Sequence, residues 1–138
     1  MFQRSPPLIV RLPAVPTAPA QARRAIGGLL DDSVSSDFAD DALLLTSEVV
    51  SNATAIGGGC ELRAWYLADE GALRVEVADH STVVPVMAQP PPSATSGRGL
   101  GIVDSIADAW GVERRADGKS VWFEMTRRHR PGPGRLPH

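Results

Sequence analysis

The chain has 138 residues, of which 43% are hydrophobic and 22% are charged, and its formal net charge at pH 7 is −2. The length is typical of one domain, and the near-neutral charge lacks the basic excess of proteins that bind nucleic acid directly. Cys60 is the single cysteine, which excludes an intrachain disulfide and a thiolate metal cluster, so we expect a reducing, cytoplasmic compartment.

The N-terminal part of the chain indicates one strand followed by two helices. Prolines interrupt the first apolar residues before a signal peptide or a membrane span could form, so we expect no membrane association. Residues 8–12 are typical of a short strand, and Pro19 suits the first turn of a helix that runs to about Leu30. A second helix follows and ends at the three glycines 57–59, because glycine is favoured just past a helix end.

Two β-hairpins are predicted in the remaining sequence. Residues 61–67 and 72–78 alternate polar with apolar side chains on either side of a turn at 69–71. Residues 111–115 and 120–125 form a similar pair that turns at Asp117 and Gly118. One face of the resulting sheet should therefore be buried.

The segment between the two hairpins, from about residue 80 to 98, shows no periodicity. Loops of this length are usually functional lids or linkers, and the sequence after this one is too short to fold as a separate domain. We therefore predict a lid within a single domain of residues 1–126, followed by an amphipathic helix that begins near Leu100 and includes Trp110. The basic residues 127–138 have few apolar groups and are predicted to be a disordered tail.

The second helix carries polar side chains beside its apolar stripe. The stripe consists of Phe38, Ala42, Leu45, Val49, Ala53 and Ile56. Glu48 and Asn52 lie one helical turn apart along its edge, together with Asp41. Polar groups beside a core normally have partners, since an unpaired carboxylate there costs on the order of several kcal/mol. The partner is either a bound cation and water, or an arginine for Glu48 and a backbone carbonyl for Asn52.

Two more elements offer contacts to a nucleotide. The lid ends, and the third helix opens, on Gly97, Arg98, Gly99, Leu100 and Gly101. Free backbone amides at a helix start suit phosphate, although glycines before a helix often only allow a turn. Asp79 ends a strand, where a carboxylate accepts from an exocyclic amine such as that of adenine or closes an Asx-turn. We interpret Lys119 as a hairpin residue rather than a phosphate ligand.

Taken in order, these motifs resemble those of the GHKL ATPase and kinase superfamily. The resemblance covers about residues 8–125 and rests on five segments: 47–53, 77–81 with Pro85, 97–103, 110–112 and 118–122. Within the superfamily, the chain is most similar to the small anti-sigma-factor serine kinases. The implied fold is α+β, a two-layer sandwich of a mixed, mostly antiparallel sheet with three helices on one face, the Bergerat ATP-binding fold.

The resemblance also implies cofactors, roles and partners. With ATP and Mg²⁺ as cofactors, Asn52 would hold the metal on the phosphates, and Glu48 would be the catalytic residue, as a general base or by orienting a water molecule. Asp79 would accept a hydrogen bond from the adenine amino group, and residues 97–101 would wrap the phosphates. The implied partners are a sigma factor and an anti-sigma-factor antagonist protein whose serine is phosphorylated, and the implied assembly is a homodimer.

Three functions remain open on the sequence alone. The first, which we expect, is a serine/threonine-protein kinase of the anti-sigma type that regulates transcription. The second is an ATP-gated protein-binding switch without phosphotransfer, and the third is a scaffold that binds no nucleotide. Glu48 favours the kinase, whereas residues 54–57, which replace the basic residue or histidine of many relatives, favour the switch. A histidine kinase is disfavoured because His80, His129 and His138 lie outside the predicted helices.

Overall fold

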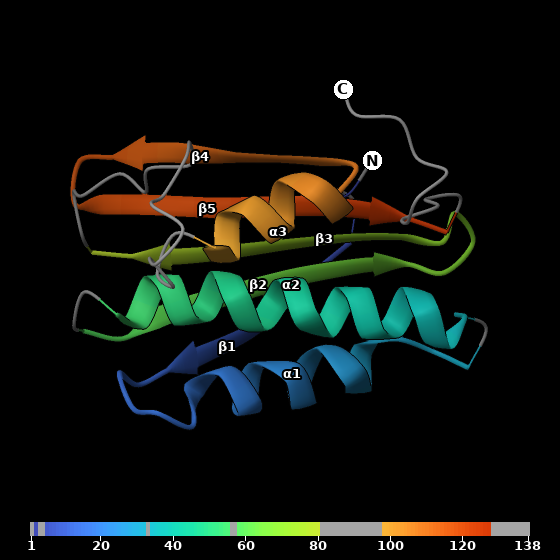
Figure 1. Cartoon of the computed structure of the whole chain (residues 1–138), viewed down its shortest axis with the longest axis horizontal. Helices are drawn as coiled ribbons and strands as arrows, with labels where there is room; N and C mark the ends of the chain where they lie inside the picture. Colours follow the sequence, from blue (N-terminus) through green and yellow to red (C-terminus); the bar gives the residue numbers. More distant parts are fainter. Residues whose placement is uncertain (1, 3–4, 33, 56–57, 81–97, 128–138) are drawn as a thin grey trace.

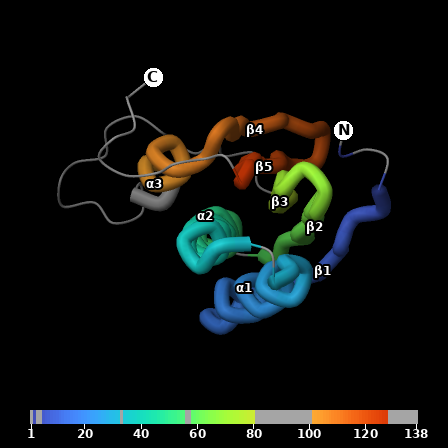
Figure 2. The backbone as a smooth tube through the Cα atoms, turned by 90° about the vertical axis from the view of Figure 1, so that its right-hand side faces the viewer, coloured from blue at the N-terminus to red at the C-terminus, as the bar shows by residue number. Residues whose placement is uncertain are grey.

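In the part of the chain that the structure describes, five strands form one sheet, and three helices cover one of its faces (Figures 1 and 2). The computed structural model describes residues 2, 5–32, 34–55, 58–80 and 98–127. The strands are β1 (Leu8–Leu12), β2 (Cys60–Leu67), β3 (Ala72–Asp79), β4 (Ala109–Arg115) and β5 (Gly118–Thr126). The helices are α1 (Ala18–Leu29), α2 (Ser36–Thr54) and α3 (Arg98–Ile106).

The strands lie in the order β1-β2-β3-β5-β4, and each pairs antiparallel with its neighbours. The α+β sandwich with its three helices on one face is therefore confirmed. The prediction of a mixed sheet is corrected in one respect, because the described strands contain no parallel pair. Short turns join β2 to β3 and β4 to β5, and such turns can connect only antiparallel strands.

Period-two alternation separates the two faces of the sheet. In β3, Val75 and Val77 are fully buried beneath the helices, whereas Arg74 and Glu76 are partly exposed on the other face. The pairing register keeps buried side chains opposite one another, as where Val75 lies between Ala64 of β2 and Phe123 of β5. The apolar side chains of the paired strands therefore form one continuous layer.

Helix α2 lies against this layer and contacts β2, β3 and the other two helices. The predicted stripe is buried at Phe38, Ala42, Leu45, Val49 and Ala53, whereas Ile56 lies outside the described residues. The helix begins with a side-chain cap, in which the backbone N–H of Phe38 donates to Ser35 Oγ at 3.1 Å. Among the helices of the described residues, none is long and apolar enough to cross a lipid bilayer.

The third helix is shorter than the sequence predicts. It ends at Ile106, where the N–H of Ala107 donates to the carbonyl oxygen of Val103 at 2.8 Å, and β4 begins at Ala109. Trp110, predicted to lie on the helix, instead pairs with Phe123 in the sheet. The prediction was wrong because Trp110 continues the helical spacing of the preceding residues while also starting the period-two pattern of β4.

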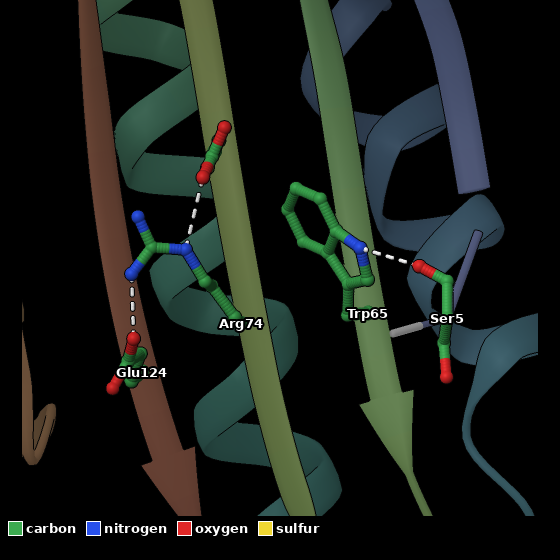
Figure 3. A network of polar contacts seen from close by, with 5 residues as sticks. Ser5, Trp65, Arg74 and Glu124 are labelled. Atoms are coloured by element: carbon green, nitrogen blue, oxygen red, sulfur yellow. Dashed lines mark hydrogen bonds and ion pairs between the residues drawn. The ribbon is translucent and has the colours of Figure 1, made fainter. Parts of the chain in front are cut away.

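The face of the sheet opposite the helices carries the ion pairs of Arg74 and the side chain of Trp65 (Figure 3). Arg74 donates to Glu76 Oε2 at 2.9 Å and to Glu124 Oε2 at 2.5 Å. Burial lowers the pKa of Arg74, but these bonds to Glu124 and Glu76 more than offset it, so the pKa is raised. Trp65 Nε1 donates to the carbonyl oxygen of Ser5 at 3.1 Å, which ties the segment before β1 to this face.

Two adjacent leucines of α2 test the packing of the helix. Leu45 is fully buried, whereas Leu44 is 39% exposed. We expect Leu45→Ala to lower the free energy of unfolding by about 2–5 kcal/mol, because it leaves a cavity against the sheet. We expect Leu44→Ala to lower it by about 1 kcal/mol or less. Urea denaturation measures both, and equal losses would contradict the orientation of α2 described here.

Candidate functional site

Glu48 and Asn52 lie one turn apart on α2, and both are half-buried at the edge of its packed face. Neither side chain forms a hydrogen bond or ion pair with another residue in the described part of the chain. Arg23 of α1 donates to Ser47 Oγ at 2.8 Å rather than to the adjacent Glu48. The internal partners considered from the sequence are therefore not found among the described residues.

A buried ion pair closes the end of β3. Lys119 Nζ lies 2.9 Å and 3.1 Å from the two carboxylate oxygens of Asp79, and the two side chains are only 2% and 4% exposed. The residues are register partners in the pairing of β3 with β5, so both side chains lie on the helix-covered face. Removing one partner of such a pair typically costs 3–5 kcal/mol, roughly, because it leaves a buried charge uncompensated.

The sequence did not predict this contact, because Lys119 was interpreted as a hairpin residue next to the turn. The structure places Lys119 inside β5, two residues before Val121 and four before Phe123, which are both buried. Period-two counting back from these residues was the available signal. A lysine on a buried face requires a carboxylate close by, and Asp79 is opposite it in the sheet.

Gly118 allows β5 to approach the end of β3. The sequence placed this glycine in the turn, whereas the structure places it in β5, opposite Arg115. A Cβ atom at position 118 would lie 1.9 Å from the backbone oxygen of Asp79 and 2.8 Å from the Cα of His80. Position 118 therefore requires glycine because of this close approach, and the turn itself consists of residues 116 and 117.

Cys60 is the neighbour of Asp79 on the other side. The two residues are paired in the register of β2 with β3, and Cys60 is buried. Burial raises the pKa of the Cys60 thiol to about 11, and the negative charge of Asp79 adds to this effect. The thiol is therefore protonated at neutral pH, and it lies next to the carboxylate as an uncharged group.

A cavity of about 520 Å³ opens at this end of the sheet. Its lining includes Leu12, Cys60, Asp79 and Arg115, from the ends of four strands. This volume lies within the range of small-molecule sites. Among the described residues, however, those that line it include none from α2 or α3. Asp79 is thus the only residue of the predicted site among the described residues that line this cavity.

The predicted site residues lie on elements that meet at one end of the molecule. In Figure 1, α2 and β3 both end on the left, and α3 begins toward the same side. The first turn of α3 contains Arg98, Gly99, Leu100 and Gly101. Gly97 and nearly all of the predicted lid lie outside the described residues.

The predicted site residues suit the two ends of a magnesium nucleotide to different degrees. At the phosphate end, Asn52 offers a neutral oxygen, which suits Mg²⁺ because this ion takes few protein ligands and keeps its waters. The amides at the start of α3 add donors for phosphate. At the base end, the carboxylate of Asp79 is already bonded to Lys119.

Comparison with known proteins identifies the family of the chain. A stretch of 56 residues is 43% identical to part of an uncharacterized protein of Streptomyces coelicolor. The matched stretch makes up 39% of this chain and 53% of that protein, so the match spans about half of the relative's length. The family model of the histidine kinase-like ATPase domain matches residues 12–125, which include Glu48, Asn52 and Asp79. The chain therefore belongs to the histidine kinase-like ATPase domain family.

Proposed function

We propose that this protein binds Mg-ATP at the end of the molecule where α2 and β3 end and α3 begins, and that it phosphorylates a serine or threonine of a partner protein. Membership of the ATPase domain family supports ATP binding. The observation that carries the kinase proposal is the pair Glu48 and Asn52. These side chains are half-buried, one turn apart and without a partner among the described residues.

The two side chains have different tasks in the proposed reaction. Asn52 holds Mg²⁺, which when bound offsets the negative charge of the phosphates. Glu48 accepts the proton of the attacking serine hydroxyl. At the same time the serine oxygen forms a bond to the γ-phosphorus, and the bond between that phosphorus and the oxygen of the leaving ADP breaks. A carboxylate that no described cation neutralises is suited to this task.

The partners that we propose follow from the resemblance to anti-sigma-factor kinases. The phosphorylated residue would belong to a small antagonist protein, and a sigma factor would bind the same kinase in another state. In this proposal the protein acts in the cytoplasm as a homodimer and regulates transcription without contacting nucleic acid itself.

One observation favours the second candidate, an ATP-gated switch without phosphotransfer. Thr54 lies one residue after the Asn52-Ala53 pair, in the segment where many related kinases carry a basic residue or a histidine. Its hydroxyl donates to the carbonyl oxygen of Val50 at 3.0 Å, so this side chain is turned back onto its own helix. A binding protein in which ATP orders a surface for a partner requires no additional phosphate contact from this position.

The magnesium assignment is tested with Asn52→Ala, and Ser51→Ala is the matched control on the exposed side of α2. Mg-ATP at a hundred times its dissociation constant should stabilise the parent protein by about 2.7 kcal/mol. We expect Ser51→Ala to keep this gain and Asn52→Ala to lose most of it, as measured by thermal unfolding and calorimetric titration. Equal Mg-ATP affinity in Asn52→Ala and the parent would remove the assignment.

The catalytic assignment is tested with Glu48→Gln, which keeps the shape of the side chain and removes its basicity. We expect Mg-ATP affinity to stay within about threefold of the parent, whereas phosphoryl transfer falls by about 10²–10⁴-fold, the usual contribution of a general base. Transfer of labelled phosphate from ATP to a candidate antagonist protein measures this. If the parent binds Mg-ATP but transfers no phosphate to any serine, the switch is the correct function.

A further inference from the structure

Among the described residues, the buried charged group of Lys119 has no task in the proposed mechanism. Lys119 is not part of the predicted site, yet it bonds to both oxygens of the carboxylate that is proposed to recognise the base. The two side chains are 2% and 4% exposed, so water contributes little to the stabilisation of either charge. The carboxylate of Asp79 is therefore already satisfied by the protein before a nucleotide arrives.

The ammonium group is a stronger donor than the amino group of a base. Hydrogen bonds from an ionised donor to a carboxylate are roughly twice as strong as those between neutral groups. A carboxylate has about four lone-pair sites, so the contact with Lys119 does not by itself exclude a further bond from a base to Asp79. The nearby positive charge of Lys119 reduces the contribution of such a bond, because it offsets the negative charge that attracts the amino group.

The same charge removes the penalty for a base with a carbonyl group at this position. A carboxylate on its own faces the 6-oxo group of guanine as one acceptor facing another, and this contact is unfavourable. An ammonium 2.9–3.1 Å from the carboxylate oxygens makes the local charge close to neutral. The pair therefore distinguishes an amino group from a carbonyl group less well than Asp79 alone would.

We propose that Lys119 determines the base selectivity of the nucleotide site, and that it makes the site tolerant of purines other than adenine. This inference rests on the proposed nucleotide binding and deepens it. Nucleoside triphosphates with either an amino or an oxo group at position 6 are bound mainly through their phosphates and metal. Lys119 is in this sense a specificity-determining residue and not a catalytic one.

The test compares the dissociation constants of Mg-ATP and Mg-GTP by calorimetric titration of the full chain. We expect the two constants to differ by less than about fivefold in the parent, because a neutral site discriminates weakly. We expect Lys119→Thr to raise the preference for ATP by about tenfold or more, chiefly through tighter ATP binding. Threonine suits a strand, and its hydroxyl still donates one hydrogen bond to Asp79.

Two further variants separate selectivity from folding. Lys119→Arg keeps a cation on Asp79 and should retain the ratio of the parent. The double variant Asp79→Asn with Lys119→Thr removes both buried charges, and an amide both donates and accepts, so its ratio should also stay close to that of the parent. Each ratio is measured within one folded protein, so a uniform loss of stability does not change it.

Each outcome decides the inference. A parent that prefers ATP by more than about fiftyfold, or a Lys119→Thr variant with an unchanged ratio, overturns it, because a site that depends on a polar contact discriminates strongly. If the parent binds neither nucleotide but Lys119→Thr binds ATP, both the inference and the proposed function of the parent fail, because the parent site then accepts no purine nucleotide. If no variant binds either nucleotide, both fail.

Discussion

The packing of α2 against the sheet is the constraint on which the rest of the site depends. Leu45, Val49 and Ala53 are buried at successive turns, so the rotation of the helix about its axis is fixed. A shift by one residue would turn it by about 100° and expose this stripe to water. Glu48 and Asn52 are consequently held at the edge of the core, where a polar side chain is partly shielded but can still reach a ligand.

The two ends of the proposed nucleotide site are built by different parts of the fold. Glu48 and Asn52 depend on the packing of a helix, whereas Asp79 and Lys119 depend on the register of two strands. The interactions that fix one end are therefore largely separate from those that fix the other. A substitution in β5 can therefore change the proposed recognition of the base while the groups that we propose for phosphate and metal keep their positions.

The sequence alone predicts the parts of the fold and of the site that depend on interactions between residues close in the chain. The stripe of α2 and the position of Glu48 and Asn52 beside it follow from helical periodicity, and the strands follow from alternation. Trp110 was misplaced because its spacing satisfies both periods. The contact between Asp79 and Lys119 joins residues 40 positions apart, and it depends on a strand register that local patterns do not determine. Gly118 was likewise assigned to the turn because its close neighbour, the backbone of Asp79, is distant in sequence.

Stability alone does not account for the ion pair at the end of β3. Buried ion pairs add little net stability, since the cost of removing two charges from water nearly cancels their attraction. Two register pairs further along the same strands, and on the same face, Val77 lies opposite Val121, and both are buried. Apolar residues would hold β3 to β5 equally well at positions 79 and 119. The two charges lie at the edge of a cavity that Asp79 lines, where in our proposal the carboxylate meets the base and the ammonium group of Lys119 weakens its preference for an amino group.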